Sequence, residues 1–340
     1  MLRTKHDAMM LPRRTFLRAA GAGLLLPVTP EGAGAADAKN DRPLTFLATA
    51  DPQINIPRWG TAGTEQTIDA MNQIAGTPFP FGGQVGEPVG VIVAGDLVDA
   101  LENPENWSRY KSFYDPRGKA RLRYPVYEGI GNHDLTSRQA FGEFNPLQRE
   151  FIQRNKQRPG DLFFCEHHYH YAWQWAGVHF VQLNLFPGND HRPVYDRPAP
   201  WNDPKRSLDF LRRYLEQHIE DKDAPIVLTW HYGLRGWGLE KWWTTEDLDR
   251  LAAAIDGYHI VLILHGHEHS FAHYQWRGYD VIMSPSPQRD RDPKTPDVPS
   301  EPKGFLVFRI TPDELQMAHR TADRWGHRWG QVLTYNLTGI

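Results

Sequence analysis

The segment from Ile260 to His269 constrains the fold most, because it joins a strand-like run to a cluster of metal-binding side chains. The residues Ile260–Leu264 are β-branched or leucine, which is typical of a buried strand. Gly266 lacks a Cβ, so the backbone can turn sharply where the strand ends. His267 and His269 follow on one loop, and paired imidazoles suit a transition metal. In a chain with 16 histidines this pattern also arises by chance, so alone it only favours a metal site.

Four further strand-like runs end in polar side chains. Each is a mostly apolar run of strand length that stops at a short polar motif. The four pairs are Leu44–Ala50 with Asp51-Pro52-Gln53, Val89–Ala94 with Gly95-Asp96-Leu97-Val98-Asp99, Val126–Ile130 with Gly131-Asn132-His133-Asp134, and Ala224–Trp230 with His231. In open α/β sheets, ligands gather at the carboxyl ends of the strands. The sequence therefore predicts that these motifs share one ligand-binding edge.

The remaining segments complete the predicted secondary structure. Apolar periodicity predicts helices over Thr64–Ala75, around Trp107, Tyr110 and Tyr114, over Ser207–Ile219, and over Leu248–Ile255 with Thr245-Glu246-Asp247 as its cap. Alternation predicts a hairpin of Tyr169–Trp175 and Val178–Leu183 with Gly177 at the turn, and antiparallel strands over Tyr279–Met283, Phe305–Ile310 and Leu315–His319. No repeat or linker divides residues 36–340. We expect one domain of the α/β class, an α+β sandwich of two packed β-sheets with helices outside.

Composition and charge exclude several classes of protein. The net charge of −3 gives no basic footprint, so we expect no nucleic-acid partner. A single cysteine, Cys165, excludes an intrachain disulfide framework and a cysteine-rich zinc site. Any bound metal must therefore be held by His, Asp, Asn, Gln or Glu.

The N-terminal segment resembles a twin-arginine export signal. Arg13-Arg14 precede Phe16-Leu17, and a small and apolar run, Ala19–Val28, leads to the small-x-small pattern Ala33-Gly34-Ala35. The alternative is a single anchoring helix, but the apolar run is too short for a bilayer core of about 30 Å. We expect residues 1–35 to be a cleaved signal, the export machinery to be a partner, and the protein to be periplasmic or secreted. No other stretch resembles a membrane span.

Taken together, the five motifs resemble those of the calcineurin-like metallophosphoesterase superfamily. They occur in the family's order, each after a strand-like run, from residue 51 to residue 269. The resemblance implies a four-layer fold of two mixed β-sheets flanked by helices. It also implies two metal ions, one held by Asp51, Gln53, Asp96 and His269, and the other by Asp96, Asn132, His231 and His267.

The resemblance also implies how the site works. Asp96 would bridge two cations that clamp a phosphate and lower the pKa of a bridging water. His133 would act at the leaving oxygen, as a general acid or an electrostatic stabiliser, and Asp99 would orient its ring. Gln53 departs from the family, which usually has histidine there. A neutral amide oxygen is a weaker ligand for zinc or iron, so we expect a weaker first site and leave Fe, Mn and Zn open.

These features predict a metal-dependent phosphatase that hydrolyses phosphomonoesters by attack of a metal-bridging hydroxide. The substrate would be a phosphoprotein, inositol phosphate, nucleotide or small phosphate ester. A phosphodiesterase acting on cyclic nucleotides or phospholipid head groups is the alternative reaction, because the fold does not set the substrate. A binding protein with a degenerate metal site is the alternative from another class.

Several other residues near the motifs carry weaker signals. We expect His265 to be a buried strand histidine, and His167, His168 and His170 to lie on a hairpin surface. Asp134 is expected to be structural. The tryptophans after His231 either pack in the core or form a rim against an apolar leaving group, and three loop arginines are candidates for phosphate binding. These residues are Trp237, Trp242, Trp243, Arg192, Arg235 and Arg289.

Overall fold

A computed structural model describes most of the chain after residue 42. The predicted signal, residues 1–35, lies outside the described residues, as do Trp237, Arg192 and Arg289. Residues Lys39–Ile340 group into one compact unit. The described ranges are 43–55, 60–99, 104–135, 146–190, 202–235, 239–288, 304–323 and 326–339.

The first of two β-sheets has six strands within the described residues, in the order β13-β12-β11-β1-β2-β3. β1, β2 and β3 run parallel, while β11 pairs antiparallel with β1, and β12 and β13 continue as an antiparallel hairpin. The sheet is therefore mixed. Its strands are β1 (Leu44–Thr49), β2 (Pro88–Val93), β3 (Val126–Glu128), β11 (Gly304–Ile310), β12 (Glu314–Asp323) and β13 (Gly326–Asn336).

The second sheet has seven strands within the described residues, in the order β4-β5-β6-β7-β8-β10-β9. β6, β7, β8 and β10 are parallel, and the strands at both edges are antiparallel to their neighbours. Its strands are β4 (Phe163–Phe164), β5 (Tyr171–Trp175), β6 (Val178–Gln182), β7 (Ile226–Thr229), β8 (Ile260–His265), β9 (Ala272–Trp276) and β10 (Tyr279–Met283).

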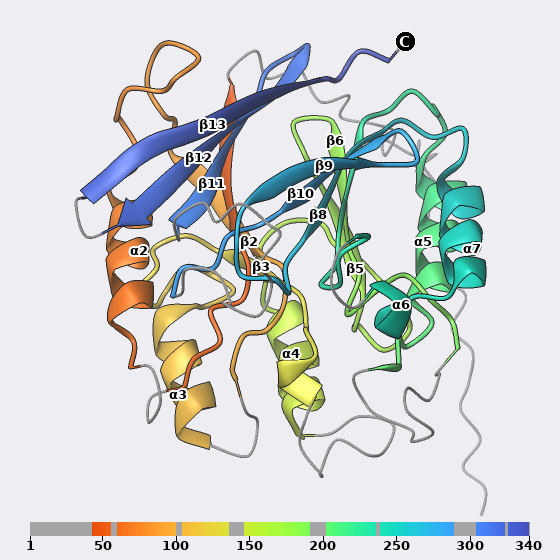
Figure 1. Cartoon of the computed structure of the whole chain (residues 1–340), viewed down its shortest axis with the longest axis horizontal. Coiled ribbons are helices and arrows are strands. Elements are labelled where there is room, and N and C mark those ends of the chain that lie inside the picture. Colours follow the sequence, from red (N-terminus) through yellow and green to blue (C-terminus); the bar gives the residue numbers. More distant parts are fainter. Residues whose placement is uncertain are drawn as a thin grey trace, which may run out of the picture. The chain divides into compact units, whose positions relative to one another are not determined.

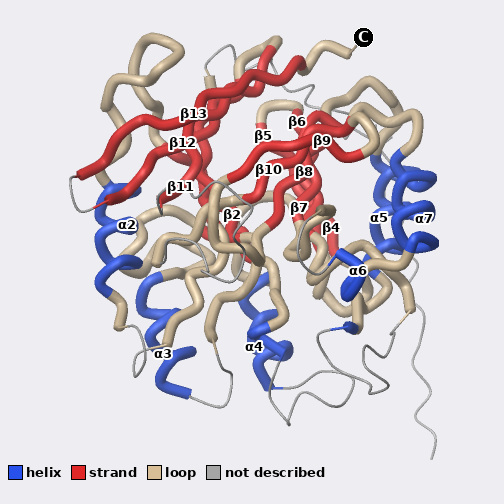
Figure 2. Tube along the Cα trace, in the orientation of Figure 1, coloured by secondary structure: helices blue, strands red, loops and turns tan. Residues whose placement is uncertain are grey.

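Helices flank the two sheets (Figure 1). Figure 2 shows α2 and α3 beside the first sheet, and α5 and α7 together beside the second. The helices are α2 (Ala62–Asn72), α3 (Pro104–Phe113), the 3-10 helix η1 (His133–Leu135), α4 (Pro146–Asn155), α5 (Ser207–His218), α6 (Leu239–Trp242) and α7 (Thr245–Ile255). Among the described helices, none is long and apolar enough to cross a membrane.

Alternation along the strands separates two layers of core. Phe46 and Ala48 of β1 face the second sheet, and Phe46 packs against Trp175 and Phe180 with ring centroids 5.4 and 5.2 Å apart. Leu47 lies between them in sequence and belongs to the other core cluster, which includes residues of α2. Because successive side chains of a strand point to opposite faces, β1 is buried on both sides. The predicted sandwich of two mixed sheets with helices outside is confirmed.

The sequence patterns do not indicate β4, β9, β13, α4 or α6, and some predicted elements differ in detail. The first helix begins at Ala62 and ends at Asn72 rather than spanning 64–75. β10 is antiparallel to β9 but parallel to β8, so that strand was predicted only in part. The N-cap of α7 is Thr244, whose side chain accepts the amide N–H of Asp247 while the Asp247 side chain accepts the Thr244 N–H, forming a capping box.

Candidate metal centre

The five motifs follow the carboxyl ends of five parallel-paired strands. Three belong to the first sheet and two to the second: Asp51 follows β1, Asp96 follows β2, Asn132 follows β3, His231 follows β7, and His267 follows β8. Backbone hydrogen bonds tie neighbouring loops together, as where Asp51 N–H donates to Gly95 O over 3.0 Å and Gly266 N–H donates to His231 O over 3.1 Å. The site therefore forms where the edges of both sheets meet.

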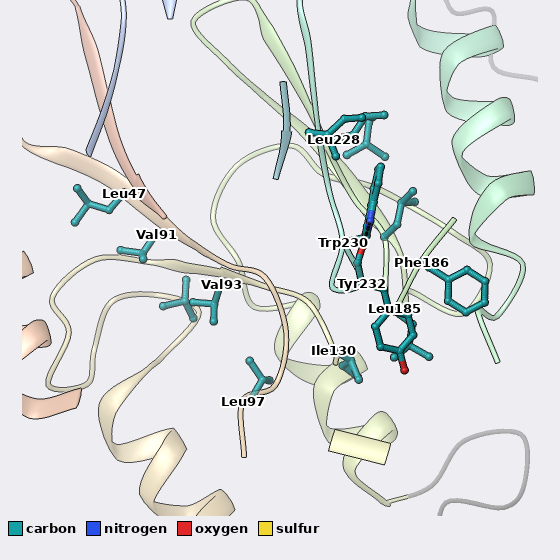
Figure 3. Packing of buried hydrophobic residues seen from close by; sticks show 14 of the residues in the cluster. Leu47, Val91, Val93, Leu97, Ile130, Leu185, Phe186, Leu228, Trp230 and Tyr232 are labelled. Atoms are coloured by element: carbon teal, nitrogen blue, oxygen red, sulfur yellow. Dashed lines mark hydrogen bonds between the residues drawn. The ribbon is translucent and has the colours of Figure 1, made fainter. Parts of the chain in front are cut away.

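Buried apolar side chains from these loops and from the loop after β6 pack together. Leu97 and Ile130 follow β2 and β3, while Leu185 and Tyr232 follow β6 and β7 (Figure 3). All four are buried members of one hydrophobic cluster. Because protein interiors are close-packed, this packing leaves the loops that carry the motifs little freedom to shift.

One group of candidate ligands consists of Asp51, Asp96 and His269. One ligand atom from each lies within 4.8 Å of the others. His269 Nε2 is 3.6 Å from Asp51 Oδ1. The Gln53 side chain reaches the same place, since its Nε2 donates to Asp96 Oδ2 over 2.9 Å. Its Oε1 is buried and has no hydrogen-bond partner among the described residues, which is costly for an amide oxygen unless a cation satisfies it.

The second group consists of Asp96, His231 and His267, again with ligand atoms within 4.8 Å. His231 Nε2 lies 3.3 Å from Asp96 Oδ1. Asn132 joins this group, because its Oδ1 lies 3.1 Å from His231 Nε2 and 3.0 Å from His267 Nδ1. His231 Nδ1 lies 2.8 Å from Ala94 O and donates its proton there, so Nε2 is the candidate ligand atom of this ring.

Asp96 is common to both groups, and its surroundings fit a pair of cations. Burial acts to raise the pKa of Asp96, but the charges of His231 and His133 outweigh it and lower that pKa. Burial raises the pKa of Asp51 well above its ordinary value, and the charge of Asp96 adds to the effect. Two buried carboxylates in one place resist joint ionisation, and bound cations reverse that penalty. The carboxylate, imidazole and amide donors suit Mn, Fe or Zn.

Five of the seven predicted ligands have backbone dihedrals in the left-handed region. The values of φ are 53° for Asp51, 37° for Gln53, 53° for Asp96, 82° for His267 and 60° for His269. A non-glycine residue there costs about 1–3 kcal/mol and persists only when its surroundings hold it. The hydrogen bonds from His267 N–H to the Asp51 carboxylate, at 3.0 and 2.9 Å, are one such restraint.

Three glycines are required by close approach to these side chains. A Cβ on Gly266 would lie 2.6 Å from Asp51 Oδ2, and a Cβ on Gly95 would lie 2.6 Å from His231 Nδ1. A Cβ on Gly131 would lie closer still to Asp96 Oδ1. All three approaches are below ordinary van der Waals contact, so the glycines allow three motif loops to pack directly against candidate ligands.

His133 lies next to Asp96 and contacts Asp99, its predicted partner. Its Nδ1 is 3.2 Å from Asp99 Oδ1 and 2.9 Å from Asp99 O, while Asn55 donates to the other carboxylate oxygen over 2.6 Å. The His133 side chain is 36% exposed, so a substrate can reach its ring. Burial acts to lower the pKa of His133, but the carboxylates of Asp96 and Asp99 outweigh it and raise that pKa to about 10 in the metal-free protein.

Asp134 has a larger structural role than its sequence position indicated. Its buried carboxylate accepts the amide N–H groups of Leu97, Val98 and Gly131 over 3.2, 3.1 and 2.9 Å. It therefore fastens the loop that carries Asp96 to the loop that carries Asn132. Burial, with the nearby charge of Asp96, raises the pKa of Asp134 to about 7.

An aromatic stack covers one side of His267. Tyr232 and Trp242 are parallel with ring centroids 4.5 Å apart, and Trp242 meets the His267 ring edge-on at 5.7 Å. Trp243 is buried and donates its indole N–H to Gly233 O over 2.8 Å, so it packs in the core. The Arg235 guanidinium lies 4.0 Å from the centroid of the Tyr274 ring rather than among the candidate ligands.

Two other histidine predictions have opposite outcomes. His265 is buried in β8, and its Nε2 accepts the hydroxyl proton of Tyr274 over 2.8 Å, which confirms a strand histidine. The prediction of a surface position is wrong for His170, which is 1% exposed. Its Nδ1 accepts the Asn184 N–H over 3.2 Å, and Asn184 in turn accepts the Ile130 N–H over 2.7 Å. His170 thus belongs to the support beneath the Asn132 loop.

Comparison with solved structures shows the same fold in proteins of distant sequence. A purple acid phosphatase, PPD1, from yellow lupin (Lupinus luteus) seeds has a TM-score of 0.58 at 11% identity, over 87% of this chain and 54% of that one. A dimetal phosphatase from Danio rerio has a TM-score of 0.55 at 14% identity, over 86% and 99%. GAP50, the anchor in the inner membrane complex of Plasmodium, has a TM-score of 0.53 at 13% identity, over 86% and 89%.

Comparison by sequence identifies the family. A search against curated proteins found no match. The sequence profile of the calcineurin-like phosphoesterases matches residues 44–271, the stretch that carries all five motifs. That match covers more than half of the chain, and it agrees with a fold in which two mixed sheets bring both groups of ligands to one edge. The chain belongs to the calcineurin-like phosphoesterase family.

Proposed function

We propose that this protein is a phosphatase that hydrolyses phosphomonoesters with the help of two bound metal ions. The observation that carries the proposal is the position of Asp96, whose carboxylate belongs to two separate groups of ligand atoms, each within 4.8 Å. A carboxylate shared in this way is what a pair of closely spaced cations requires, because it offsets their mutual repulsion.

We assign the first metal to Asp51, Gln53, Asp96 and His269, and the second to Asp96, Asn132, His231 and His267. When bound, such a pair polarises a phosphoryl group and lowers the pKa of a bound water. Gln53 contributes a neutral oxygen in place of an imidazole, which favours a harder ion such as Mn²⁺ at the first position. Fe and Zn remain the other candidates for the pair.

His133 is proposed to donate a proton to the leaving oxygen or to stabilise its charge. Its ring is partly exposed beside the ligand groups, and the contacts of its Nδ1 with Asp99 orient the ring, which supports a role at the leaving oxygen of a substrate. The backbone N–H of His133 donates to Asp96 Oδ1 over 2.9 Å, which holds the backbone of His133 next to the shared carboxylate of Asp96. Asp99 is a positioning residue in this scheme, because it acts through His133.

The competing proposal is a binding protein with this fold and no catalysis. The likeness to the Plasmodium anchor shows that the fold also occurs in a protein described by a structural role. In this chain, however, each group brings three candidate ligand atoms within 4.8 Å of one another, and His133 lies 3.2 Å from the Asp99 carboxylate. A metal pair and a positioned acid are what hydrolysis requires, so these features support the proposal of an enzyme.

The proposed substrate is a phosphomonoester: a phosphoprotein, an inositol phosphate, a nucleotide or a small phosphate ester. A diester of the cyclic-nucleotide or phospholipid head-group type is the alternative that the test must distinguish. We further propose that residues 36–340 form a single catalytic domain exported through a twin-arginine signal in residues 1–35. Protein recovered from the periplasm would then begin near residue 36, whereas an intact N-terminus would argue for retention.

The test is a screen of the purified protein, supplied with Mn²⁺, Fe²⁺ or Zn²⁺, against matched mono- and diesters of nitrophenol and of alkyl alcohols. Metal content is measured on the same sample. We expect two metal ions per chain and hydrolysis of monoesters in preference to diesters. Full metal content without hydrolysis of either ester class would favour the binding protein, and preference for diesters would move the assignment to a phosphodiesterase.

A further inference from the structure

We propose that Ser286, which lies outside all five motifs, is a positioning residue for the first metal. It lies on the segment Ser284–Gln288, which follows β10 in the second sheet and leads toward β11 in the first. This segment is hydrogen-bonded to the end of β1 and the residue after it. Ala50 N–H and the Thr49 hydroxyl both donate to Pro285 O, over 3.2 and 2.8 Å.

The Ser286 side chain connects this segment to Asp51. Its hydroxyl donates to the backbone oxygen of Asp51 over 2.8 Å and accepts the Gln288 N–H over 3.2 Å. Ser286 is 0% exposed, so water does not compete for either bond. Its own N–H also reaches the backbone oxygen of His269, at 3.5 Å. One residue therefore contacts the backbones of two residues assigned to the first metal.

Gln288 anchors the other end of this support. Its Oε1 accepts both the N–H and the hydroxyl proton of Thr64, each over 2.9 Å, and its Nε2 donates to Gly60 O over 3.1 Å. Thr64 lies in the first turns of α2, so the support is fixed to a helix rather than to another loop. Asp51 is thereby connected to α2 through Ser286 and Gln288.

Asp51 needs this support more than an ordinary ligand does. Its φ of 53° is strained for an aspartate, and the residue after it is Pro52, which has no N–H with which to hold the turn. The first metal also receives a neutral amide from Gln53, so its affinity depends more on the exact placement of Asp51 and His269. Groups that orient a metal ligand commonly change metal affinity by 10–100-fold when they are removed.

Ser284 provides a matched control. It lies two residues before Ser286, is also 0% exposed, and its hydroxyl has no hydrogen-bond partner in the part of the chain that the structure describes. Ser284→Ala and Ser286→Ala therefore remove the same atom from equally buried positions of one segment. Only Ser286→Ala removes a bond to the backbone of Asp51.

The experiment titrates the metal-stripped full chain with Mn²⁺ alone, by calorimetry, and measures thermal unfolding without metal. This inference rests on the proposed function, and it predicts two binding steps for the unchanged protein. We expect Ser286→Ala to weaken one step by about tenfold and to leave the other within about twofold, and Ser284→Ala to change neither. In a His269→Ala background, which removes a ligand of the same metal, Ser286→Ala should add little.

Three results would overturn the inference. The first is that Ser286→Ala binds both ions as the unchanged protein does, and the second is that Ser286→Ala and Ser284→Ala weaken both steps and lower the unfolding temperature equally. The third is full additivity with His269→Ala, which would show that Ser286 does not act on the first metal. Failure of the unchanged protein to bind Mn²⁺, Fe²⁺ and Zn²⁺, each titrated in the same way, would instead contradict the proposed function, and the inference with it.

Discussion

Replacing Gly266 by alanine should lower both stability and metal affinity, because the added methyl group has no room. The added Cβ would lie 2.6 Å from Asp51 Oδ2, 2.7 Å from Ala50 Cβ and 2.9 Å from Ala94 O. None of these neighbours is the free end of a flexible chain, because two are backbone or Cβ atoms and the carboxylate is held by two hydrogen bonds from His267 N–H. The loop or Asp51 must therefore move.

The size of the effect follows from the cost of overpacking. Inserting a methyl group into a filled site costs about 1–3 kcal/mol. In a domain of this size each kcal/mol lowers the unfolding temperature by roughly 2–4 °C, so a loss of about 2 kcal/mol corresponds to about 4–8 °C. Displacement of Asp51 should also weaken the first metal by about tenfold or more.

Gly330→Ala is the control for this substitution. Gly330 lies in β13, and an added Cβ there would approach His319 Nδ1 and Thr321 Cγ2 no closer than 3.4 Å. Its effect on stability should stay within about 0.5 kcal/mol. Thermal unfolding and Mn²⁺ titration of both variants measure the difference. If Gly266→Ala unfolds and binds Mn²⁺ as Gly330→Ala does, the close approach of Gly266 to Asp51 is not a real constraint.

Three further predictions concern single side chains. Asp96→Asn should abolish hydrolysis and most metal binding, as measured by turnover and metal content, and near-normal turnover would refute its bridging role. His133→Ala should lower turnover by roughly 10²-fold or more for alkyl phosphates and by less for nitrophenyl phosphate, whereas equal losses would count against proton donation. Burial lowers the pKa of His319 to about 4, against about 6.5 when unfolded, so the unfolded chain binds the proton first as pH falls. The contribution of neutral His319 to stability is thus present above about pH 6.5 and lost toward pH 4. The free energy of unfolding, measured with urea at pH 7.5 and pH 5, should fall by about 2 kcal/mol less in His319→Phe than in the unchanged protein. An equal fall in both proteins would show that His319 is not buried in its neutral form.

The parallel strands that carry the motifs could be predicted because they are buried on both faces. β8 reads as an unbroken apolar run for this reason, and β1 and β2 read almost as clearly. Each run stops where the backbone turns toward the site, so the polar residues that follow mark the strand ends. Helix α7 was predictable from its apolar face, although its cap lies one residue earlier than expected.

Other features depend on contacts that no local pattern records. β13 is an edge strand in which Tyr335 is the only buried side chain among those described, while Trp329 and Leu333 are partly buried. Its apolar alternation is therefore too sparse to indicate a strand of this length. His170 was assigned to the surface because it lies beside two other histidines, whereas the fold turns it inward against Asn184. The buried position of a single histidine is decided by packing across the sheet, and composition does not reveal it.

The residues of the site likewise fall into those that the sequence predicts and those that it does not. The candidate ligands could be found because a metal requires particular side chains at short spacings within each motif. The groups that hold them could not, since they act through the backbone. Asp134 accepts N–H groups from a loop 36 and 37 positions away, and Ser286 contacts Asp51 across 235 positions. A side chain that hydrogen-bonds to the backbone of a residue far away in sequence leaves no local pattern from which the contact could be predicted.

The most direct test of the account is an anomalous-scattering map from crystals of the catalytically active protein loaded with Mn²⁺. If two metal ions share the Asp96 carboxylate, the map should show two peaks about 3.5–4 Å apart on either side of it. One peak should lie among Asp51, Gln53 and His269, and the other among Asn132, His231 and His267. A single peak, or a pair located away from Asp96, would contradict it.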